Sequence, residues 1–173
     1  QSTDYCFPNR HEEYAVLKRA AALRPDLANT WYYLGNVEWN ADQKDAALGS
    51  WKKALALKPD HALALRNVGF GLAHPGTYFT NTGIPTGVPS EEAYGYYVKA
   101  LAADPTNFRA LEEMDKLAEK LGKGTAERLA TMKKYRATAE KYDACILRMA
   151  YLFNEAGDYD ASLAILTGRR FHV

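Results

Sequence analysis

Apolar residues recur three and four positions apart through most of the chain, which is the spacing of one face of an α-helix. The segment 28–61 carries this pattern in Trp31, Leu34, Gly35, Ala47, Trp51, Ala54 and Pro59. Small residues in this pattern let two antiparallel helices approach, and Pro59 cannot continue the second helix. The segment is therefore predicted to be a helical hairpin, and no stretch of the chain shows the alternation of a strand.

A fixed period repeats this hairpin along the chain. Pro25 and Pro59 follow Ala-Leu stretches and lie 34 residues apart, whereas Pro59 and Pro105 lie 46 apart. The second interval exceeds the first by twelve residues, so one repeat carries an insertion. The segment 74–89 holds three Pro and three Gly, which excludes a helix interior and indicates a loop.

The fold class predicted from this period is an all-α solenoid of stacked antiparallel helix pairs, with about nine helices. We expect a single array over residues 1–173: a half repeat 9–25, a repeat 28–61, a repeat 62–107 with the loop insertion 74–89, a degenerate repeat 108–141 and a repeat 143–167. In the degenerate repeat, Asp115 stands where the other repeats have a small residue.

Residues that favour helix ends fall between the expected helices. Asn9 with Glu12 forms a capping-box pattern at the first start. Gly122 and Gly157 suit the turns that end helices. The N-cap candidates for the later helices are Asp26, Asp60, Ser90, Thr125 and Asp158.

The spacing Trp31-x-x-Leu34-Gly35, followed by a small residue, an aromatic residue, Ala54 and Pro59, resembles the tetratricopeptide-repeat (TPR) family. The resemblance implies a right-handed superhelix in which the first helices of successive repeats line a concave groove. Such a groove binds an extended peptide or a partner helix. The expected partner is therefore a protein or peptide.

Three short stretches resemble something narrower, the repeat region of large bacterial TPR proteins. They are Asp4–Arg10, Trp31–Asn36 and Gly168–His172. Those proteins carry an uncharacterised N-terminal β domain and are associated with carbohydrate metabolism. The resemblance implies that the chain is an internal fragment of a longer bacterial protein.

Stepping the repeat along the chain predicts the side chains that face the groove. They are Asn29, Tyr32, Asn36, Trp39, Asn40, Arg66, Phe70, Arg109, Lys116 and Tyr151. Asn36, Arg66, Arg109 and Lys116 are suited to hold a peptide backbone or an acidic group.

Each of these assignments has a structural alternative. Tyr32, Trp39 and Phe70 would instead pack against the neighbouring repeat. Arg109 and Lys116 would instead pair with nearby glutamates on a solvated helix face. In the insertion, Tyr78 and Phe79 either contact a partner or fold back onto the scaffold.

Composition removes several classes of function. The 22 Lys and Arg against 21 Asp and Glu give a net charge of +1, which argues against nucleic-acid binding. No apolar run approaches the ~18 residues that span a membrane, and no signal segment is evident, so the expected location is cytoplasmic. Cys6 and Cys145 match no metal or redox spacing, and the four histidines are scattered. No catalytic motif is found, so we expect no enzyme, cofactor or metal.

The sequence therefore predicts a non-catalytic interaction or scaffolding module. The alternative is a helical scaffold within a larger carbohydrate-active enzyme, with Trp39, Tyr32 and Tyr151 stacking on a glycan. A further alternative is a homo-oligomer that forms through uncapped terminal helices.

Overall fold

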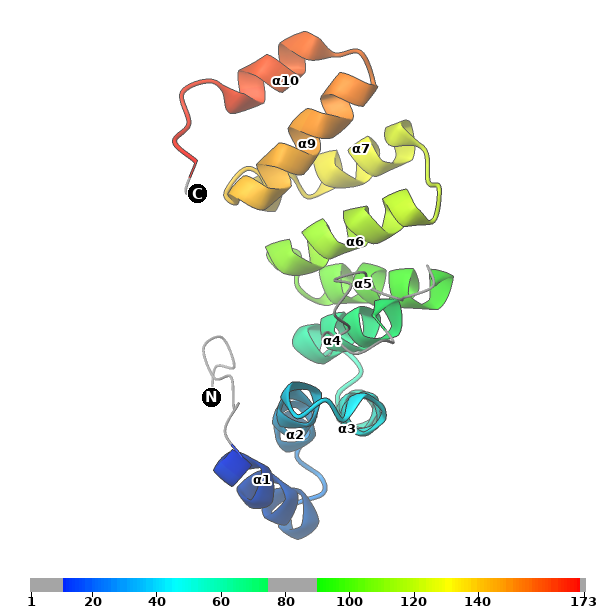
Figure 1. Ribbon diagram of the computed structural model, residues 1–173, viewed down its shortest axis with the longest axis vertical. Helices are drawn as coiled ribbons and strands as arrows, with labels where there is room; N and C mark the ends of the chain where they lie inside the picture. Colours follow the sequence, from blue (N-terminus) through cyan, green and yellow to red (C-terminus); the bar gives the residue numbers. More distant parts are fainter. Residues whose placement is uncertain (1–10, 75–89, 172–173) are drawn as a thin grey trace. The chain divides into compact units, whose positions relative to one another are not determined.

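The computed structural model describes residues 11–74 and 90–171, and within these ranges it contains ten helices and no strand (Figure 1). The chain divides into two compact units, Gln1–Val88 and Pro89–Val173. Each unit buries its own apolar residues, among them Trp51 and Val68 in the first unit and Tyr97 and Leu111 in the second.

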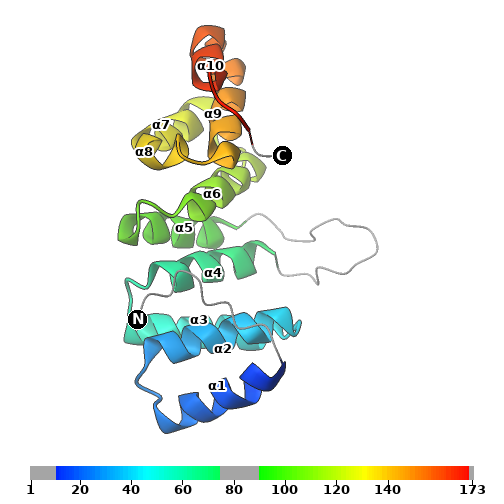
Figure 2. The ribbon, with the colours of Figure 1, turned by 90° about the vertical axis from the view of Figure 1, so that its left-hand side faces the viewer.

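The described part of the first unit contains four helices, which Figures 1 and 2 show in blue to cyan-green. They are α1 (His11–Leu23), α2 (Ala28–Asn40), α3 (Lys44–Leu57) and α4 (Ala62–Ala73). α2 and α3 form the closest hairpin, α1 packs on α2, and α4 packs on α3. The hairpin is close because Gly35 has no side chain: a Cβ there would lie 2.5 Å from the Trp51 indole.

The second unit contains the other six helices of the described chain. They are α5 (Glu91–Ala103), α6 (Phe108–Lys120), α7 (Thr125–Lys134), α8 (Arg136–Ala139), α9 (Asp143–Glu155) and α10 (Tyr159–Leu166). α6 packs on α5 and also contacts α7 and α9, and α9 pairs with α10. The helix expected after Gly122 is broken at Tyr135, whose φ of −104° and ψ of 28° leave the helical region, so two helices replace one.

The same turn closes three of the hairpins. Asp42, Gly122 and Gly157 have φ values of 62°, 73° and 75°, the left-handed conformation that ends helices. The next amide in each turn bonds a carbonyl five residues back: Gln43 to Glu38, Lys123 to Ala118 and Asp158 to Phe153. The predicted roles of Gly122 and Gly157 are confirmed, and Asp42 occupies the same position without being glycine.

The helix starts follow the sequence prediction only in part. Ser90 and Asp158 accept hydrogen bonds from the amides of Ala93 and Ala161, as expected of N-caps. The predictions for Asp26, Asp60 and Thr125 are wrong.

The actual N-caps at those three starts are Leu27, His61 and Gly124. The chain turns into α2 and α4 one residue later than expected, and Asp26 pairs with Arg24 instead. Asn9 lies outside the described residues, as do Cys6 and residues 75–89 with Tyr78 and Phe79.

The all-α helical-repeat class is confirmed, because each described unit is built from paired helices alone. A single array over the whole chain stays a prediction, since the two units are defined separately. None of the described helices combines the length and the apolar character needed to cross a membrane.

Candidate partner-binding face

A row of amide side chains joins the two repeat-starting helices of the first unit. The Asn36 Oδ1 accepts hydrogen bonds from Trp51 Nε1 at 3.0 Å and from Asn67 Nδ2 at 2.9 Å. Asn67 in turn accepts from an Arg66 guanidinium nitrogen at 3.0 Å. Because Trp51 is buried in the hairpin, it fixes Asn36, and Asn36 fixes the row.

A second polar pair lies at the N-terminal end of the same two helices. The Nδ1 of His61 accepts the amide of Ala64, so a neutral ring carries its proton on Nε2. That nitrogen lies 3.1 Å from Asn29 Oδ1 and donates to it. Burial lowers the pKa of His61, and the positive charge of Lys58 lowers it further.

Aromatic side chains gather at the opposite end of α2 and α4. Trp39 meets Phe70 edge-on, with ring centroids 5.7 Å apart, and His74 stacks on Phe70 at 4.4 Å. Lys44 lies 3.9 Å from the Trp39 ring centroid. We define the α2–α4 face as the polar row and this aromatic end: Asn29, Asn36, Trp39, Asn40, Arg66, Asn67 and Phe70.

Of the predicted groove residues in this unit, Tyr32 has a different environment. Its side chain is only 2% exposed, and its ring lies 4.9 Å from that of His61. Tyr32 therefore packs against the next helix, the alternative given from the sequence. The sequence does not predict Asn67 and His61 as residues of this face. Their hydrogen bonds with α2 join residues 31 and 32 positions apart, whereas the repeat period pairs residues 34 positions apart.

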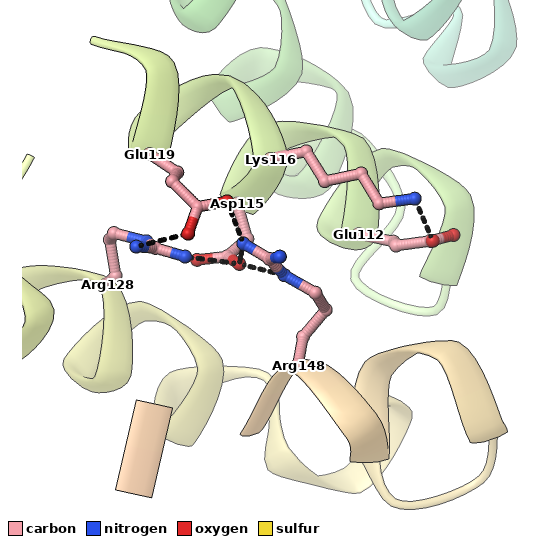
Figure 3. A network of polar contacts seen from close by, with 6 residues as sticks. All are labelled: Glu112, Asp115, Lys116, Glu119, Arg128 and Arg148. Carbon is pink, nitrogen blue, oxygen red and sulfur yellow. Dashed lines mark hydrogen bonds and ion pairs between the residues drawn. The ribbon is translucent and has the colours of Figure 1, made fainter. Parts of the chain in front are cut away.

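The remaining predicted residues, Arg109, Lys116 and Tyr151, belong to the second unit. Arg109 is exposed beside the ring of Phe108. Lys116 pairs with Glu112 one turn away at 2.6 Å (Figure 3), which is the self-paired arrangement considered as its alternative. Tyr151 is partly exposed, and the guanidinium of Arg148 lies 5.5 Å from its ring centroid.

The second unit also contains an ion network across three helices, and its central pair, Asp115 and Arg128, is buried (Figure 3). Arg128 of α7 binds both Asp115 oxygens, at 2.9 and 3.0 Å. Arg148 of α9 binds Asp115 at 2.6 Å and Glu119 at 3.0 Å. Two cations and two carboxylates thus satisfy one another, and the network holds α6, α7 and α9 together.

Three further observations concern the rest of the described chain. A cavity of about 430 Å³ lies between α1, α2 and α3, with Trp31 and Leu34 in its lining. Within residues 11–74 and 90–171 no group of three or more His, Cys, Asp or Glu could hold a metal ion. Burial raises the pKa of the Cys145 thiol to about 12, which keeps it protonated and unreactive.

Comparison with solved structures supports the repeat fold. PilF of Pseudomonas aeruginosa has a TM-score of 0.70 and 21% identity, over 89% of this chain and 64% of that one. YrrB, described as a TPR protein with an unusual peptide-binding site, has a TM-score of 0.69 and 18% identity, over 88% and 72%. MamA of Desulfovibrio magneticus RS-1 has a TM-score of 0.64 and 17% identity, over 90% and 81%.

No family model matches the sequence, and no curated protein is similar to it. The solved structures therefore show that this chain shares the all-α helical-repeat fold of TPR proteins. The narrower likeness to large bacterial proteins with a β domain finds no support in these comparisons.

Proposed function

We propose that the chain is a non-catalytic interaction module that binds a peptide along the α2–α4 face. The observation that carries the proposal is the amide row of Asn36 and Asn67, which the Trp51 indole holds in place. Amide side chains present both donors and acceptors, the pattern that a peptide backbone requires.

Charge and apolar surface beside the row favour an acidic peptide with an apolar side chain. Arg66 ends the row with a positive charge, and its guanidinium lies 4.9 Å from the Phe70 ring centroid. Trp39 and Phe70 offer half-buried aromatic edges next to it. The fold that this chain shares with YrrB, described as having a peptide-binding site, also supports the proposal.

Titration with fluorescently labelled peptides of acidic, basic and uncharged composition tests this function. We expect the acidic peptides to bind best and to weaken as salt rises. Arg66→Ala should weaken their binding at least about tenfold, since a hydrogen bond to a charged group is worth about 1.5–3 kcal/mol. Lys52→Ala removes the same charge from an exposed site on α3 and serves as the matched control. Equal losses in both variants would contradict binding at this face.

The predicted groove residues Arg109, Lys116 and Tyr151 belong to the second unit and are tested separately. A weaker affinity in Arg109→Ala would assign peptide binding to the second unit as well. An unchanged affinity in Arg109→Ala would confine the site to the first unit.

A glycan is the alternative ligand, on a chain that serves as scaffold in a larger bacterial carbohydrate-active enzyme. Trp39 and Tyr151 retain exposed ring surface for stacking on a sugar, whereas Tyr32 does not. Glycan binding should be insensitive to salt and to Arg66→Ala, and it should be lost in Trp39→Ala. The same titration with neutral oligosaccharides therefore separates the two ligands.

A further inference from the structure

The last hairpin, α9 and α10, repeats the first, α2 and α3, in a register of 115 residues. The turns correspond, since Asp42 and Gly157 both take the left-handed conformation. The small residue at Gly35 corresponds to Ala150, and both are buried. Equivalent positions can therefore be compared side by side.

In the first hairpin, α4 covers three of these positions. Tyr32 packs on His61, Asn36 bonds Asn67, and the Leu48 side chain fills the space beside Gly71. α9 packs on the hairpin of α6 and α7 as α4 packs on the first hairpin. Leu129 has the position in α7 that Leu48 has in α3, and it is only 7% exposed. Each of these hairpins is thus completed by the helix that packs on it.

Two of the corresponding positions of the last hairpin are exposed in the described chain. Leu147 and Leu163 correspond to Tyr32 and Leu48, and they are 53% and 66% exposed. Tyr151, the counterpart of Asn36, instead lies beside Arg128 of the preceding hairpin, whose guanidinium is 6.0 Å from its ring centroid. Tyr159, one turn before Leu163 on α10, is 69% exposed. We call Leu147, Tyr159 and Leu163 the end face. Its geometry suits a helix, because a helix covers the equivalent surface in both earlier cases.

The chain itself offers a helix with a matching apolar stripe. On α1, Val16 and Leu23 are seven residues apart on one helix face and are 68% and 61% exposed. Arg19 lies between them on that face and is exposed, and the end face carries the opposite charge at Asp160, beside Tyr159. Ala21, on the other side of α1, is buried where that helix packs on α2.

We propose that the end face of one copy binds the Val16–Leu23 stripe of α1 in a second copy. The contact is heterologous, since the two surfaces are different, and a dimer retains one free end face on one copy and one free stripe on the other. Association therefore continues beyond a dimer. It uses a different surface from the α2–α4 face and does not depend on peptide binding there.

Light scattering on the wild-type chain and two exposed-site variants tests the proposal. The wild-type mass should rise with concentration above twice the 19.3 kDa of one chain. Val16→Glu and Leu163→Lys should each be monomeric, because each destroys one surface. An equimolar mixture of the two should form a heterodimer and nothing larger, since it contains one intact surface of each kind.

Val98→Glu is the control, because Val98 is an exposed apolar residue on α5, outside both surfaces. It should self-associate like the wild type, and circular dichroism should show all variants equally helical. A wild-type chain that stays monomeric at roughly 1 mM, the concentration matching a weak contact of −4.1 kcal/mol, would overturn the proposal. A stable dimer of either variant alone would also overturn it, because that contact would join like surfaces.

Discussion

At the scale of single residues, Gly35 and Trp51 determine how closely α2 and α3 pack. We expect Gly35→Ala to destabilise the first unit by about 1–3 kcal/mol, the usual cost of overpacking a core, because the new Cβ collides with the indole. Urea unfolding followed by tryptophan fluorescence measures this directly, since Trp31, Trp39 and Trp51 all lie in the first unit.

Gly49 on α3 is the matched control, because a Cβ there would meet no atom within 4 Å. Gly49→Ala should stabilise the unit by about 0.5–1 kcal/mol through better helix propensity. Equal effects of the two substitutions would show that the approach of Gly35 to Trp51 is not tight.

His61 makes the stability of the first unit depend on pH. Burial lowers its pKa in the folded state, so the unfolded chain binds more protons as the pH falls through the ordinary histidine range. Stability is then complete above the unfolded pKa of about 6.5 and declines below it, by at most about 1.4 kcal/mol per pH unit for one group. Protonation also removes the Nδ1 lone pair that caps α4.

The comparison of wild type with His61→Asn isolates this group from the other histidines. Asparagine caps a helix without titrating in this range, so the variant should lose less stability between pH 7 and pH 5. Urea midpoints from tryptophan fluorescence at both pH values give the difference. Parallel pH profiles would assign the dependence to other residues.

At the scale of helices and hairpins, a charged pair in the second unit occupies the positions where the first hairpin has two small residues. Gly35 and Ala47 face each other in the first hairpin, whereas Asp115 and Arg128 do so in the hairpin of α6 and α7. Asp115→Ala should cost about 3–5 kcal/mol, because it leaves the buried Arg128 without its main partner.

The double variant Asp115→Ala/Arg128→Ala should cost less than Asp115→Ala alone, since it restores the small pair and leaves no unpaired buried charge. Thermal unfolding followed by circular dichroism compares the variants. A double variant that is the least stable of the set would show that the network contributes net stability beyond mutual compensation.

The sequence predicts the helices better than their contacts. Apolar periodicity depends on neighbouring residues, and it predicts the hairpin that contains Trp31 and Trp51. The predicted N-caps of α2 and α4 are wrong, because Asp26 and Asp60 have suitable side chains but lie one residue before the true N-caps. In the sequence, Asp115 stands out as a departure from the repeat. Its partner Arg148, 33 residues away, is identified only by the packing of α9 on α6.

The candidate face shows the same limit. The period placed Asn36 and Arg66 on repeat-starting helices, and the structure joins them through Asn67. It placed Trp39 on the same helix as Asn36, where its ring meets that of Phe70. It did not show that Tyr32 is buried, because an aromatic residue at that position suits either a groove or the adjacent helix.

At the scale of the whole molecule, the two units have separate cores and only one contains tryptophan. Fluorescence therefore reports the first unit, whereas circular dichroism reports the helices of both. We expect Asp115→Ala to lower the temperature of part of the dichroism transition and to leave the fluorescence midpoint unchanged, because the network lies entirely within the second unit. Gly35→Ala should do the reverse and lower the fluorescence midpoint. If Asp115→Ala also moves that midpoint, the units unfold as one cooperative array, as nearest-neighbour coupling between stacked repeats would require.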